Sequence, residues 1–66
     1  MTLEELFKVL DMGARCVIWN DEGKTNEPPI ITGRAFECQR EKDLLEKEVK
    51  QIVPSEMYRI DIFIKL

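Results

Sequence analysis

The sequence contains no histidine, one serine and two cysteines among its 66 residues. Without histidine, the chain cannot assemble a Ser–His or Cys–His nucleophile pair. Cys16 and Cys38 form no CxxC pair and have no histidine to complete a zinc tetrad. The acidic residues fall on predicted helix surfaces and in one loop, where solvated carboxylates are the ordinary interpretation. We therefore expect a protein that is not an enzyme and that uses no metal and no cofactor.

Long apolar runs are also absent. No segment approaches the roughly 20 apolar residues that a membrane-spanning helix needs, and the first residues lack the basic and apolar regions of a secretion signal. We expect no membrane partner and a cytoplasmic location, where both thiols stay reduced.

The charge balance is acidic, with 13 Asp and Glu against 10 Lys and Arg and a net charge of −3. Binding to nucleic-acid phosphates depends on clustered basic residues, and the basic residues here are scattered along the sequence, so we expect no nucleic-acid partner. With 44% apolar and 35% charged residues, the composition is that of an ordinary globular domain. The length allows one domain, residues 1–66.

The first predicted element is a helix over about 3–12. Thr2 and Glu5 have the spacing of a capping box, and Gly13 stands where a left-handed residue commonly ends a helix. The apolar residues between them fall on one helical stripe: Leu3, Leu6, Phe7 and Leu10.

Strands are predicted next. Residues 15–20 hold four consecutive apolar side chains, which is typical of a central strand covered on both faces. A turn over 20–23, with Gly23 at positive φ, leads into a loop that ends at Pro28-Pro29. A second strand is predicted over 30–36, in which Gly33 marks a bulge or a close backbone approach.

The last part of the chain contains a short helix within 39–48 and a strand over 58–66 that alternates isoleucines with other residues. Residues 49–53 fit either a continued helix or a strand, and we favour the strand. The predicted fold class is α+β. It has a small antiparallel sheet of three to four strands and two short helices, in the order α-β-β-α-(β)-β.

Four segments carry a resemblance to small proteins encoded by phages and prophages of Gram-positive bacteria: TLEELFKVLD, VIWNDEGK, IITGRA and DLLEKEVKQI leading into YRIDIFIKL. The resemblance implies a small α+β fold in the cytoplasm of a bacterial host and implies no reaction. Some phage proteins of this size bind and block bacterial defence enzymes, so the resemblance also suggests an inhibitor.

The candidate binding residues lie in the loop over 20–29 and on the sheet face opposite the isoleucines. We expect polar contacts from the loop and apolar contacts from the sheet, given by Trp19, Asp21, Glu22, Lys24, Asn26, Glu27 and Phe63. Phe63 and Trp19 supply apolar surface on the second face of the sheet. Either the helices divide between the two faces, or one face is left for a partner. The preferred hypothesis is a non-catalytic protein-binding module. The alternative is a self-associating protein whose sheet face or edge forms a homodimer.

Overall fold

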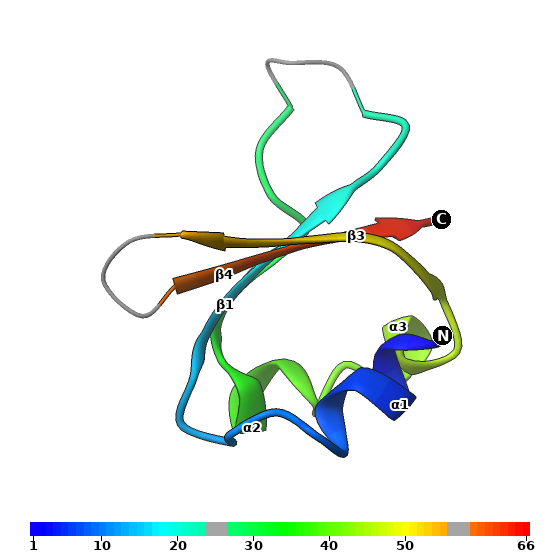
Figure 1. Cartoon of the computed structure of the whole chain (residues 1–66). Helices are drawn as coiled ribbons and strands as arrows, with labels where there is room; N and C mark the ends of the chain where they lie inside the picture. The colour runs from blue at the N-terminus through cyan, green and yellow to red at the C-terminus, as the bar shows by residue number, and fades with distance from the viewer. Residues whose placement is uncertain (24–26, 56–58) are drawn as a thin grey trace.

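The computed structural model describes residues 1–23, 27–55 and 59–66. It contains one four-stranded sheet and, in the described residues, three short helices that lie on the same side of it (Figure 1). The elements in chain order are α1 (Leu3–Phe7), β1 (Arg15–Asn20), β2 (Ile31–Arg34), α2 (Ala35–Cys38), α3 (Lys42–Leu45), β3 (Glu48–Ser55) and β4 (Arg59–Lys65). The predicted α+β class is confirmed. The predictions for Lys24 and Asn26 lie outside the described residues.

The strand order across the sheet is β2-β1-β4-β3. β1 pairs with β2 and β3 pairs with β4 in antiparallel hairpins, whereas the two central strands β1 and β4 are parallel. The predicted antiparallel sheet is therefore corrected to a mixed sheet. The physical reason is the connection through α2 and α3, which crosses one face and so lets the second hairpin join the first with its last strand parallel to β1.

The predicted capping box at the start of α1 is present. The backbone N–H of Glu5 donates to Thr2 Oγ1 at 3.2 Å, and the backbone N–H of Thr2 donates to Glu5 Oε1 at 2.8 Å. The bond from the Thr2 backbone stabilises the ionised carboxylate, which lowers the pKa of Glu5. The first helix thus begins where the sequence indicates.

α1 ends at Phe7, so the predicted extent to residue 12 is wrong. The N–H groups of Lys8 and Val9 bond to carbonyls three residues back, at 3.2 and 3.1 Å, which tightens the last turn and ends the helix. The left-handed conformation predicted for Gly13 is also wrong, since Gly33 alone among the described glycines has a positive φ. Instead, the Gly13 N–H donates to Asp11 Oδ1 at 2.9 Å in a local turn.

The strand predicted over 30–36 ends at Arg34, where the chain enters α2. The Arg34 N–H donates to Glu37 Oε1 at 3.0 Å, which satisfies a backbone donor at the start of the helix. Gly33 adopts φ +154°, a backbone conformation that favours glycine. A Cβ there would make ordinary van der Waals contact with the Glu37 side chain, at 3.4 Å from the same carboxylate oxygen, so the predicted close backbone approach is wrong. The register of β1 and β2 runs through Gly33 without a bulge. Since α2 forms from the last two residues of the predicted strand and the two residues after them, the helices number three in the described chain instead of two.

β3 confirms the strand that we favoured for 49–53, and β4 confirms the alternation near the C-terminus. Ile62 and Ile64 are fully buried beneath the helices, while Phe63 between them is only half-buried on the opposite face. Asn20 and Gly23 close the predicted turn, because the Gly23 N–H donates to the Asn20 carbonyl at 3.0 Å.

The hydrophobic core lies between the helices and one face of the sheet. Its buried members come from α1, α2 and the inward positions of β1 and β4: Leu3, Leu6, Phe7, Cys16, Ile18, Ala35, Cys38, Ile62 and Ile64. The prediction that β1 is a central strand is confirmed, but the helices do not divide between the two faces (Figure 1). No helix in the described ranges is long and apolar enough to cross a membrane.

Candidate functional site

We call the sheet face that points away from the helices the open face. Strand residues paired in register project to the same face, and this rule assigns its members from the pairings of Val17, Trp19 and Phe63. They are Arg15, Val17 and Trp19 of β1, Thr32 and Arg34 of β2, Arg59, Asp61, Phe63 and Lys65 of β4, and Glu48, Gln51, Val53 and Ser55 of β3. The open face therefore has arginines at one end, Val17 beside Thr32 and Asp61 in its middle, and the aromatic residues Trp19 and Phe63 toward the other end.

Trp19 and Phe63 form an aromatic pair on the open face. They are register partners on the two central strands, and their rings stack with centroids 6.2 Å apart and an interplanar angle of 16°. Such pairs contribute about 0.5–1.5 kcal/mol beyond the area they bury. Trp19 Nε1 is inaccessible to solvent and makes no hydrogen bond within the described residues. The two stacked rings thus form one apolar surface, part of which is exposed.

A groove of about 300 Å³ lies beside this aromatic pair. Loop residues form one wall and strand residues the other: Trp19, Asn20, Asp21, Gly23, Glu27, Pro28, Asp61 and Phe63. Of the residues predicted as a binding site, the structure brings together Trp19, Asp21, Glu27 and Phe63. Glu22 is exposed but does not line the groove, and Lys24 and Asn26 lie outside the described residues.

The loop is anchored where it leaves β1. The Asp21 N–H donates to the Ile64 carbonyl of β4 at 2.8 Å, and the Glu22 N–H donates to Asn20 Oδ1 at 3.1 Å. The positive φ predicted for Gly23 is wrong. A Cβ at Gly23 would lie 3.1 Å from the Asn20 carbonyl oxygen, which is a tight contact with backbone, and it would also displace the flexible end of the Glu27 side chain. The described ends of the loop extend beyond the sheet, away from the helices (Figure 1).

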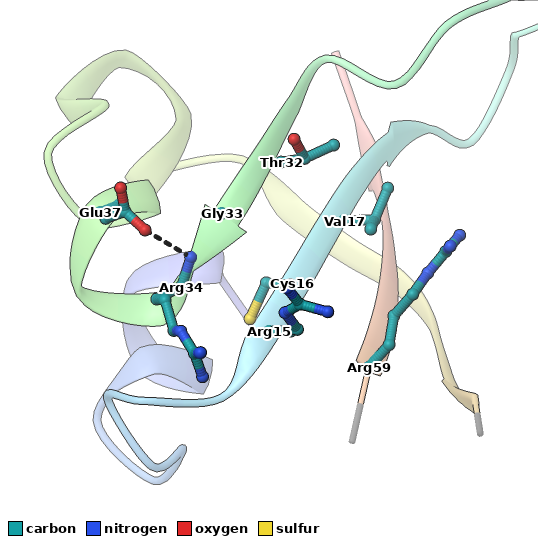
Figure 2. Close-up of a pocket in the computed structure, with 8 residues that line it drawn as sticks. All are labelled: Arg15, Cys16, Val17, Thr32, Gly33, Arg34, Glu37 and Arg59. Atoms are coloured by element: carbon teal, nitrogen blue, oxygen red, sulfur yellow. Dashed lines mark hydrogen bonds between the residues drawn. The ribbon is translucent and has the colours of Figure 1, made fainter. Parts of the chain in front are cut away.

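Three of the four arginines lie on neighbouring strands at the other end of the open face. Arg15 of β1 is the register partner of both Arg34 of β2 and Arg59 of β4, and we call these three residues the arginine row. The three arginines line a hollow of about 400 Å³. Figure 2 shows them with the other lining residues, among them Val17 on β1 and Thr32 on β2. The basic residues are scattered in the sequence, yet folding gathers these three.

The arginine row is only partly neutralised. Arg59 Nε donates to Asp61 Oδ1 at 2.8 Å, and Arg34 Nη1 donates to the Gly13 carbonyl at 2.7 Å. Arg15 makes no side-chain hydrogen bond or ion pair within the described part of the chain. All three residues are exposed. Like charges on neighbouring strands repel each other, so the in-register placement of the three arginines adds a repulsion that Asp61 offsets at Arg59.

Part of the arginine row could have been predicted from the residues at the strand ends. Arg15 begins the predicted strand 15–20, and an antiparallel hairpin places the start of one strand against the end of the next. That rule favours a contact with Arg34, whose strand returns along β1. The pairing with Arg59 depends on the parallel contact between β1 and β4, which the sequence pattern did not indicate.

The cysteines and the carboxylates are the other groups in the described residues that could carry chemistry. Cys16 and Cys38 are free but buried among the core side chains. Across residues 1–23, 27–55 and 59–66, no three Cys, Asp or Glu side chains gather in a way that would hold a metal ion. Comparisons with protein-family models, curated proteins and solved structures find no match to this chain. The class of protein defined so far is a small α+β domain with one open, charged and partly aromatic sheet face.

Proposed function

We propose that this chain is a non-catalytic protein-binding module whose open face and loop over 20–29 contact a protein partner. The observation that carries the proposal is the groove beside Trp19 and Phe63, where a stacked aromatic pair is bordered by the loop on the uncovered side of the sheet. Apolar surface with a polar rim is typical of protein interfaces.

The residue types on this face support the proposal. Trp and Arg are enriched among the residues that dominate binding energy at protein interfaces, and both occur here on neighbouring strands. Pro28 and Pro29 restrict the backbone where the loop approaches β2, and a restricted loop loses less conformational entropy on binding. Binding residues also concentrate in loops that a rigid sheet positions.

The resemblance to small phage-encoded proteins gives the proposal a direction. It suggests that the partner is an enzyme of a bacterial host, such as a defence enzyme, and that binding blocks its activity in the cytoplasm. A small rigid surface is sufficient for such inhibition, because a module that contacts its target needs no chemistry of its own.

The test is affinity capture from a bacterial lysate with two variants matched in charge. One variant combines Asp21→Lys with Glu27→Lys in the groove. The control combines Glu41→Lys with Glu46→Lys, both exposed and flanking α3 on the helical side. We expect the groove variant to lose the captured protein and the control to retain it, with similar melting temperatures. Equal retention by the two variants would contradict the proposed surface.

A further inference from the structure

We propose that the arginine row binds an acidic segment of the protein partner, with partner carboxylates seated across Arg15, Arg34 and Arg59. This inference rests on the proposed function, which it deepens by assigning the chemistry of the contact at this end of the open face. The groove beside Trp19 and the arginine row then act as two ends of one interface.

The arginine row places three positive charges on neighbouring strands. Arg15 faces Arg34 on one side and Arg59 on the other, in register across three strands. The chain as a whole is acidic, with a net charge of −3, so this positive cluster is a local departure from its charge. An anionic ligand removes the repulsion that the isolated sheet contains, and binding is favoured by that relief.

Most N–H groups of the three guanidinium groups are available as hydrogen-bond donors. Arg15 is exposed and has no acceptor among the described side chains. Arg59 uses its Nε for Asp61, and Arg34 uses one Nη for Gly13, which leaves further N–H groups on each guanidinium. Hollows of about 400 and 690 Å³ adjoin the row, and all three arginines line both of them. Planar guanidinium groups bind carboxylates in bidentate geometry.

The charge pattern along the whole open face indicates which kind of anion fits it. Four residue steps separate Arg15 from Trp19, about 13 Å along the strand. The face turns acidic over that distance, because Asp61 lies between the two ends and Asp21 and Glu27 line the groove. A nucleic-acid strand carries a charge on every nucleotide and would meet these carboxylates. A protein segment with acidic residues at one end and apolar or basic residues at the other matches the pattern.

The experiment is an NMR titration of the isotope-labelled full chain with a short polyglutamate peptide. The readouts are the Nε–H signals of the arginines and the backbone amides of Val17 and Thr32. Parallel titrations use a polylysine peptide and a single-stranded oligothymidine. The variants are Arg15→Gln and, as the matched control, Arg40→Gln, which removes the fourth arginine in the exposed segment between α2 and α3.

We expect polyglutamate to shift the signals of the arginine row and to bind about tenfold more weakly to the Arg15→Gln protein, the loss of about one charge-assisted hydrogen bond. The Arg40→Gln protein should bind like the unmodified chain, and added salt should weaken binding. Because Arg15→Gln removes repulsion, its melting temperature should stay equal or rise, which separates a binding role from a structural one.

Three results would overturn the inference. One is an equal response of the two variants to polyglutamate, or no response at all. Another is tighter binding of oligothymidine than of polyglutamate at the same salt, which would indicate a nucleic-acid surface. The third is a concentration-dependent dimer that Arg15→Gln dissociates, which would make a second copy the occupant. The proposed function would survive the first result if the groove variants still lost the captured partner, so the two failures are distinguishable.

Discussion

At the scale of single residues, the two cysteines are small hydrophobic members of the core. Cys16 is 1% exposed and Cys38 is fully buried. Burial raises the pKa of both thiols, that of Cys16 to about 11, because a buried thiolate loses its hydration. The raised pKa values favour the protonated and less nucleophilic form of both thiols.

This environment predicts how the thiols respond to a labelling reagent and to pH. In the native protein at neutral pH, we expect iodoacetamide to modify neither cysteine, and both should react once denaturant unfolds the chain. Because the folded pKa of Cys16 lies above the usual 9.0, the neutral buried thiol contributes its full stabilisation below pH 9.0. This stabilisation is lost as the pH rises toward the folded pKa. Denaturation midpoints measured across alkaline pH should fall accordingly. Native labelling as fast as that of the unfolded chain would contradict the buried placement.

The candidate site was only partly predictable from the sequence. Trp19 and Phe63 were identified because each breaks an apolar alternation, and the structure places them in contact. The arginine row was missed, because each member looks ordinary in its own strand. A cluster of this kind depends on register between strands distant in sequence, which hydrophobic pattern alone does not specify.

At the scale of elements, β4 is one of the two strands whose buried side chains belong to the core, together with β1. Ile62 and Ile64 are fully buried beneath the helices, and β4 has a partner strand on each side. Such a strand was predictable, since strict alternation over its whole length identifies both its secondary structure and its inward face. α1 was predictable only in its start, because apolar spacing at Leu10 also fits the tight turns that follow Phe7. α2 was missed because Ala35 and Cys38 occur in a segment with strand-like neighbours.

The register of β3 and β4 offers a matched test of this burial. Ile62 and Ile52 are paired across the two strands, yet Ile62 is 0% exposed whereas Ile52 is 42% exposed. We expect Ile62→Ala to lower the free energy of unfolding by about 2–5 kcal/mol through lost burial and a residual cavity. Ile52→Ala should cost much less, because its side chain already contacts solvent. Chemical denaturation of both variants measures the difference, and equal losses would show that the helices do not cover Ile62 as described.

At the scale of the whole molecule, the two sheet edges decide whether copies of the chain associate. β2 is an edge strand of only four residues. β3 is longer, but its pairing shifts register between Val49 and Gln51 around Lys50, and Pro54 lacks a backbone donor. Short edges, bulges, lysine and proline are the features by which proteins prevent edge-to-edge pairing. These edges therefore favour a single chain in solution over a homodimer joined through its sheet edge.

We accordingly expect sedimentation equilibrium to give the mass of one chain, 7.8 kDa, over a wide range of concentration. The informative variant combines Lys50→Val with Pro54→Val, which removes the charge and restores a backbone donor on the β3 edge. This variant should self-associate as concentration rises, since an unprotected edge strand recruits further strands. Its control, Lys47→Val, changes a residue just before β3 and should leave the mass unchanged. A dimer formed by the unmodified chain would instead support the self-association hypothesis. If Arg15→Gln did not dissociate that dimer but the β3 edge variant altered it, the contact would lie at the edge, and the open face would remain available for a foreign partner.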